Sequence, residues 1–149
     1  MNVEIKICGL TGRDDAAAAL DMGADYIGFV LFNGSPRCIT PIRLRKILDV
    51  MTGIYRAVGV FVNTSRAKVE KIAADCGLFA VQLHGNEKPA HFAGTKVSLW
   101  RSIRLAEGGI YDPRPEGWQA GMFLIDSVVP GQFGGTGTRA DWKEAALFA

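Results

Sequence analysis

The feature that most constrains the fold is a repeated alternation of short apolar segments with amphipathic or turn-rich ones. Most of the apolar segments are nearly continuous in apolar residues, which is typical of parallel strands that are buried on both faces. Strands that alternate with helices indicate βαβ units around a parallel sheet, so we predict an α/β fold. The expected strands are 3–8, 24–32, 55–63, 79–85, 96–105 and 120–127.

Helical segments fill most of the gaps between these strands. Thr11 and Thr40 are the expected N-caps of the first two helices, and Pro41 suits a first helical position. The segment 106–119 contains too much glycine and proline for a clear helix. Two architectures fit this order, an open doubly wound sheet and a (β/α) barrel, and both carry their chemistry at the carboxyl ends of the strands. The expected helices are 11–24, 40–51, 64–77, 86–94 and 141–149.

Composition narrows the function classes. The length of 149 residues indicates one domain, 1–149. The net charge is only +2 and the 17 basic residues form no run, so we expect the protein to bind neither nucleic acid nor a membrane. No apolar stretch approaches the roughly 18 residues needed to span a bilayer, and the N-terminus shows no secretory pattern. The spacing of Cys8, Cys38 and Cys76 matches no metal motif. We therefore expect a cytoplasmic protein with free thiols and no bound metal.

The first strand ends in an unusual pair of side chains. Lys6 and Cys8 share one face because side chains alternate along a strand, and Ile5 and Ile7 are expected to face the helices. A nearby cation or the start of the first helix would favour the thiolate form of Cys8. A buried, inert cysteine is the alternative.

Polar side chains also end other strands. His84 ends the fourth strand and shares a face with Gln82, and Asp126 follows an apolar run near the end of the sixth. Arg37 lies on the loop after the second strand, where a guanidinium could hold a carboxylate or phosphate. A glycine-rich loop after the sixth strand includes Gly134 and Gly135, and such loops bind phosphates or simply connect elements. A thiol and a carboxyl across one site suit proton abstraction and donation on a small substrate.

Several longer motifs carry a family resemblance along nearly the whole chain. The motifs are KICGLT at 6–11, GADYIGFVLFNGSPRCIT at 23–40, VGVFVN at 58–63, VQLHGNE at 81–87 and DSVVPGQFGGTGTRADW at 126–142. With these motifs the chain resembles phosphoribosylanthranilate isomerase, an enzyme of tryptophan biosynthesis. The resemblance implies a TIM-type (β/α)8 barrel, of which this chain would encode six units.

The resemblance also implies an activity and roles for individual residues. The reaction would be an Amadori rearrangement of N-(5-phosphoribosyl)anthranilate to the 1-deoxyribulose phosphate, with no cofactor. Cys8 would be the general base, Asp126 the general acid, and Arg37 would bind the anthranilate carboxylate. Lys6, His84, Gly134 and Gly135 complete the candidate substrate-binding set. We expect Lys6 to favour ionised Cys8, and burial to raise the pKa of Asp126 so that it holds a proton at neutral pH.

One departure from the family pattern concerns length. Barrels of this class have at least about 200 residues. The family's seventh and eighth strands, with their phosphate-binding turns, have no counterpart among these residues. We therefore expect unpaired first and last strands, a protein that is a monomer, a homodimer or completed by another chain, and little isomerase activity from this chain alone. The alternatives are a truncated, non-catalytic barrel fragment or an open α/β module that binds another phosphorylated metabolite.

Overall fold

The computed structural model describes residues 3–105, 111–112, 115–127 and 142–146. All six predicted strands form within or close to their expected ranges. Helices form in four of the gaps between them, and one more follows the last strand. The elements are β1 (Lys6–Cys8), α1 (Arg13–Asp21), β2 (Tyr26–Val30), α2 (Pro41–Asp49), β3 (Ala57–Phe61), α3 (Arg66–Cys76), β4 (Ala80–Leu83), α4 (Pro89–Phe92), β5 (Leu99–Leu105), β6 (Tyr111–Asp112), β7 (Met122–Ser127) and α5 (Trp142–Ala146).

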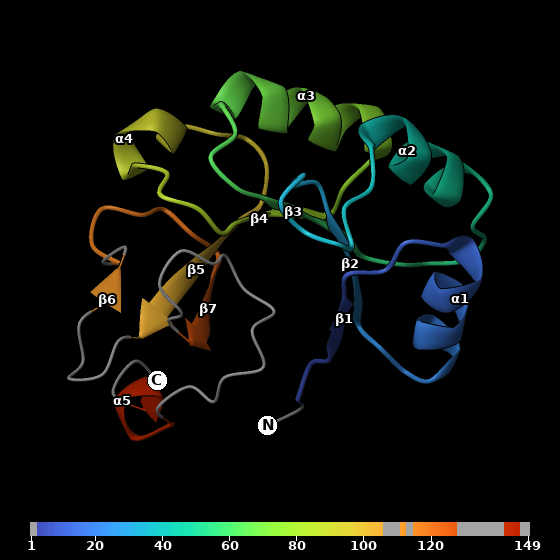
Figure 1. Cartoon of the computed structure of the whole chain (residues 1–149), viewed down its shortest axis with the longest axis horizontal. Helices are drawn as coiled ribbons and strands as arrows, with labels where there is room; N and C mark the ends of the chain where they lie inside the picture. The colour runs from blue at the N-terminus through green and yellow to red at the C-terminus, as the bar shows by residue number, and fades with distance from the viewer. Residues whose placement is uncertain (1–2, 106–110, 113–114, 128–141, 147–149) are drawn as a thin grey trace.

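The sheet has the parallel topology that the βαβ order predicts. Strands pair in the order β1-β2-β3-β4-β5, and β7 continues the sheet as a parallel partner of β5. The sheet curls, and helices α1 to α4 lie on its outer side (Figure 1). This arrangement is that of a TIM-type barrel wall, so the predicted fold class is confirmed. The short strand β6, which pairs antiparallel with β5, was not predicted because two residues are too few to show a period.

Local sequence signals explain where α2 begins and where α3 ends. The hydroxyl of Thr40 accepts a hydrogen bond from the Arg43 amide at 3.2 Å, and Pro41 opens α2 as predicted. Gly77 ends α3 in the left-handed conformation with φ 62°. The prediction of Thr11 as the cap of α1 was wrong, because the helix begins at Arg13 and Gly12 occupies the N-cap position.

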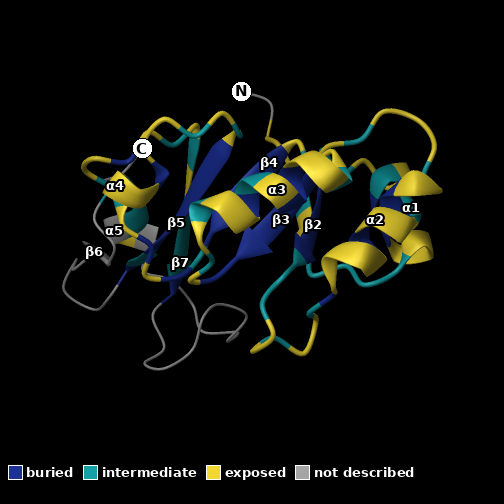
Figure 2. Cartoon of the chain, turned by 90° about the horizontal axis from the view of Figure 1, so that it is seen from above, coloured by how far each residue is buried: buried dark blue, intermediate teal, exposed yellow. Residues whose placement is uncertain are grey.

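Alternate side chains of the strands pack outward against the helices and form two buried clusters. Ile27 and Phe29 of β2 pack in the cluster that contains Leu44 of α2, and Phe61 of β3 packs in the one that contains Val69 of α3. The strands under α3 are buried while the outer faces of the helices are exposed (Figure 2). Removal of this apolar surface from water is the main stabilising contribution to the fold.

The other face of the sheet is the concave one, and it changes character along the strands. Near the amino ends it is apolar, with Tyr26 and Trp100 in edge-to-face contact at 4.9 Å between ring centroids. Val58 and Ala80 belong to the same cluster. Because side chains alternate along a strand, the next residue on this face lies two positions further along. On several strands that next residue is polar. The fold therefore gathers polar groups at the carboxyl ends.

The first strand departs from expectation on its outer face. Ile5 and Ile7, which were expected to face the helices, remain 49% and 42% exposed, so the described residues cover them only in part. In the same described part of the chain, β1 pairs only with β2, and β7 only with β5. Both outer strands of the sheet thus keep one edge without a described partner. Among the described helices, none has the length and apolar character required to traverse a membrane.

Candidate active site

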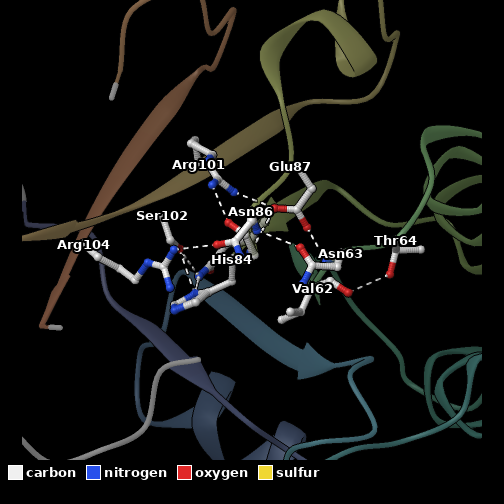
Figure 3. A network of polar contacts seen from close by, with 11 residues as sticks. Val62, Asn63, Thr64, His84, Asn86, Glu87, Arg101, Ser102 and Arg104 are labelled. Carbon is white, nitrogen blue, oxygen red and sulfur yellow. Dashed lines mark hydrogen bonds and ion pairs between the residues drawn. The ribbon is translucent and has the colours of Figure 1, made fainter. Parts of the chain in front are cut away.

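His84 connects the carboxyl ends of three strands. It directly follows β4, and its Nε2 lies 3.0 Å from Oδ2 of Asp126 on β7. Its Nδ1 lies 2.8 Å from the hydroxyl oxygen of Ser102 on β5 and 3.1 Å from Nε2 of Gln82 on β4. The ring is almost enclosed, with its side chain 11% exposed. Figure 3 shows it beside Ser102. Both ring nitrogens therefore have defined partners, which holds the imidazole in one orientation.

Lys6 extends this group of contacts to the first strand. Its ammonium donates a hydrogen bond to Oε1 of Gln82 and lies over the ring of Trp100, 5.6 Å from the centroid. Burial lowers the pKa of Lys6, and the charge of Cys8 opposes that shift. This influence of Cys8 on Lys6 is consistent with the prediction that the two side chains share one face.

Cys8 is packed closely against the neighbouring strand. It pairs in register with Gly28 of β2, and a Cβ at position 28 would lie only 2.7 Å from the Cys8 sulfur. Gly9 follows with φ +85°, a conformation that glycine adopts readily. Arg37 lies over Gly9 and donates from Nη1 to the Cys8 carbonyl oxygen at 3.3 Å. The loop after β2 therefore brings its guanidinium to the end of β1.

The ionisation of Asp126 differs from what the sequence suggested. The hydrogen bond from His84 is the largest influence and lowers the pKa of the Asp126 carboxyl, and burial opposes it without prevailing. The Ser127 amide, which donates to Oδ1 at 2.8 Å, and the charge of Arg104 also lower it. The expectation that burial would raise this pKa was wrong, because burial came with a strong hydrogen-bond partner.

A buried ion pair supports the segment that follows His84. Arg101 of β5 points to the outer side of the sheet, where its Nη1 lies 2.8 Å from Oε2 of Glu87, and the two side chains are 0% and 3% exposed. Glu87 also accepts from the amides of Asn63 at 2.6 Å and Gly85 at 2.9 Å (Figure 3). Sequence reasoning missed this pair, although a charged residue inside the apolar strand β5 was its signal.

The predicted site residues form two groups that polar side chains connect. Cys8 and Arg37 lie together at the carboxyl end of β1, and Lys6 lies two residues before Cys8 on the same strand. His84 and Asp126 lie together at the ends of β4 and β7. The connection runs through Gln82, which the sequence placed on the face of His84, and through Ser102, for which the sequence held no signal. Gly134 and Gly135 lie outside the described residues.

The donor groups of this site favour acid–base chemistry. In the described part of the chain, no group of three or more His, Cys, Asp and Glu side chains has the arrangement of a metal site. A thiol, an imidazole–carboxylate pair, an ammonium and a guanidinium at one rim can instead move protons and hold an anionic substrate.

A curled parallel βα sheet with ionisable side chains at the carboxyl ends of its strands defines an enzyme of the TIM-barrel class. A sequence model of N-(5'phosphoribosyl)anthranilate (PRA) isomerase matches residues 5–146. The chain is 37% identical to N-(5'-phosphoribosyl)anthranilate isomerase of Pelobacter propionicus over 144 residues, which cover 97% of this chain and 68% of that protein. The chain belongs to the phosphoribosylanthranilate isomerase family.

Solved structures agree with this assignment. The phosphoribosyl anthranilate isomerase of Thermus thermophilus superposes with a TM-score of 0.81 at 31% identity, over 97% of this chain and 70% of that one. A phosphoribosyl anthranilate isomerase in complex with reduced 1-(o-carboxyphenylamino)-1-deoxyribulose 5-phosphate superposes with a TM-score of 0.66 at 34% identity, over 70% of this chain and 55% of that one. The chain thus spans about two thirds of the length of the first of these relatives, 68%.

Proposed function

We propose that this chain catalyses the Amadori rearrangement of N-(5'-phosphoribosyl)anthranilate to 1-(2-carboxyphenylamino)-1-deoxyribulose 5-phosphate. The family assignment supports the reaction, and a related structure holds a reduced form of the product. The observation that carries the proposal for this chain is that a thiol and a hydrogen-bonded carboxyl occupy the carboxyl ends of β1 and β7 in one curled sheet. Proton transfers alone complete this isomerisation, so the proposal requires no cofactor.

In the proposed mechanism, the side chains divide two proton transfers between them. Asp126 gives a proton to the ribose ring oxygen, the ring opens, and C1 becomes an iminium carbon. Cys8, as thiolate, then removes the proton from C2 and an enol-amine forms. Return of a proton to C1 and loss of the enol proton give the ketone. Arg37 binds the anthranilate carboxylate, because a guanidinium matches a carboxylate with two parallel hydrogen bonds.

The lowered pKa of the Asp126 carboxyl favours its ionised form, and its partner His84 is the largest cause of that shift. At 3.0 Å between His84 Nε2 and Asp126 Oδ2, the imidazole holds the carboxyl in one orientation while Asp126 takes up and gives the proton. We propose that this hydrogen-bonded carboxyl, rather than an isolated one, delivers the proton. Removal of that proton leaves neutral His84 donating to ionised Asp126, which is the form that the lowered pKa favours.

Two further candidates for this site are less well supported. A non-catalytic barrel fragment has no support in the comparisons, since the relatives compared are named as isomerases. A module that binds another phosphorylated metabolite through Gly134 and Gly135 depends on residues outside the described part of the chain.

The test is direct conversion of the substrate by the full chain. Substrate and product have equal mass, so 13C NMR of labelled sugar should follow the appearance of the C2 ketone carbon. The short length suggested little activity from this chain alone, but the family assignment leads us to expect turnover by the wild type. We expect a loss of about 10²- to 10⁴-fold in Cys8→Ser and in Asp126→Asn. Cys38→Ser, which removes a thiol on the loop after β2, should keep wild-type turnover. A folded wild-type chain that gives no more ketone than Cys8→Ser would refute the proposal.

A further inference from the structure

We infer that Gln82 and Ser102 are positioning residues that hold His84 in the tautomer with hydrogen on Nε2, so that its ring orients the Asp126 carboxyl at the mouth of the site. This inference rests on the proposed function, because it assigns Asp126 the role of the acid. Its basis is a continuous hydrogen-bonded chain from Lys6 on β1 to Asp126 on β7.

The orientation of the Gln82 amide is the first step. The ammonium of Lys6 has only hydrogens to donate, so the atom of Gln82 that faces it must be the oxygen, Oε1. The amide nitrogen Nε2 then faces the other way and donates to the Ser102 hydroxyl oxygen at 2.9 Å. Lys6 is thereby the residue that defines which end of the Gln82 amide meets the imidazole.

The tautomer of His84 follows from that orientation. Nε2 of Gln82, which can only donate, lies 3.1 Å from Nδ1 of His84, and the Ser102 hydroxyl lies 2.8 Å from the same nitrogen (Figure 3 shows Ser102 and His84). A hydrogen on Nδ1 would face a donor, whereas a bare Nδ1 accepts from one. The hydrogen therefore belongs on Nε2, which lies 3.0 Å from Asp126 Oδ2.

The consequence is an acid whose geometry is defined before substrate arrives. Asp126 accepts from the imidazole at one oxygen and from the Ser127 amide at the other, so both oxygens have a partner. Two charged or titratable groups on other strands also act on this network. Arg104 on β5 influences Asp126, and Cys8 on β1 influences Lys6. Contacts of this kind remove the reorganisation that a mobile carboxyl would need.

Nitrogen-15 NMR of histidine-labelled protein tests the tautomer without any assay of activity. The chain has two histidines, and His91→Gln at an exposed position of α4 assigns the signals. In the wild type we expect hydrogen on Nε2 and a bare Nδ1 for His84. In Gln82→Glu the carboxylate keeps an acceptor for Lys6 but presents a second acceptor to the ring, so the hydrogen should appear on Nδ1.

Gln119→Glu makes the same exchange at an exposed position and should leave the His84 signals unchanged. Hydrogen on Nδ1 in the wild type would overturn the inference, and this measurement decides even if Gln82→Glu fails to fold. The same tautomer in wild type and in folded Gln82→Glu would also overturn it.

Kinetics connects the tautomer to the reaction. We expect kcat of Gln82→Glu to fall by about tenfold or more with KM changed by less than about threefold, because the acid is displaced while the substrate contacts remain. Ser102→Ala should lower kcat in the same direction. If the wild type shows the predicted tautomer but no turnover, the proposed function fails and the tautomer assignment stands. If turnover occurs and kcat of folded Gln82→Glu equals that of wild type, the positioning role fails.

Discussion

The sulfur of Cys8 occupies the space that a side chain at position 28 would need. Cys8 and Gly28 are paired in register on β1 and β2, and a Cβ on residue 28 would lie 2.7 Å from the sulfur and 3.1 Å from the Cys8 Cα. A glycine at this position is therefore required by the thiol beside it, and the position of the thiol depends in turn on that glycine.

Gly28→Ala should displace the thiol of Cys8 with little change of the fold. We expect isomerase turnover to fall by about 10- to 100-fold, since a shift near 1 Å of a catalytic group has an effect of that size. The measurement is kcat by ketone formation, with circular dichroism to check the fold. Gly121→Ala is the matched control. A Cβ at position 121 would lie 3.9 Å from the Leu99 carbonyl oxygen, which is an ordinary van der Waals distance. Full activity in Gly28→Ala would contradict the assignment of Cys8.

Arg37→Ala should weaken substrate binding more than it slows chemistry. Hydrogen bonds to a charged group contribute about 1.5–3 kcal/mol, which corresponds to a rise in KM of about 10- to 150-fold. Arg37→Lys keeps the charge but loses the planar fork, so we expect an intermediate KM. Steady-state kinetics measures both, with Arg13→Ala, at an exposed ion pair, as the control. A KM for Arg37→Ala equal to that of wild type would show that Arg37 does not bind the carboxylate.

Glu87→Gln should destabilise the protein strongly. The substitution leaves the guanidinium of Arg101, which is 0% exposed, without its carboxylate, and breaking a buried pair in this way lowers the unfolding free energy by about 3 kcal/mol. Urea unfolding measures the change. Glu70→Gln breaks the pair between Arg66 and Glu70, whose side chains are 35% and 32% exposed, and should change stability far less because solvent screens the pair. Equal effects of the two substitutions would contradict a special role for the buried pair.

Stability should fall in acid partly through Asp126. Because His84 lowers the pKa of this carboxyl in the folded protein, the unfolded chain takes up the proton first as pH falls. The stabilisation is present above the ordinary aspartate pKa of about 3.9 and is lost as pH falls through the lower folded pKa. Urea unfolding of wild type and Asp126→Asn should therefore converge in free energy as pH decreases from about 5 to about 2. A difference that stays constant across this range would exclude the predicted shift.

Periodicity along single strands was sufficient to predict which residues share a face. The alternation in β1 places Lys6 beside Cys8, and that in β7 places Asp126 in line with Met122 and Leu124. Ile27 and Phe29 face the helices for the same reason. These predictions depend only on the period of two within a strand, and the βα order then brings the carboxyl ends to one rim.

Contacts between strands could not be predicted in this way. Ser102 reaches His84 from the next strand, 18 residues away in the sequence, and Glu87 binds Arg101 across 14 residues. No local pattern records these distances, since they depend on register and on the curl of the sheet. The sign of the Asp126 pKa shift belongs to the same group, because it depends on a histidine 42 residues away.

The sequence by itself determined the order of strands and helices, the faces on which side chains lie, and the motifs that identify the family, because these depend on neighbours along the chain. The tertiary structure decided which polar groups meet, and hence that Asp126 is held as a carboxylate by His84 and that Gln82 connects it to Lys6. The physical reason is that hydrogen bonds and ionisation act over a few ångströms in space, whatever the separation in sequence.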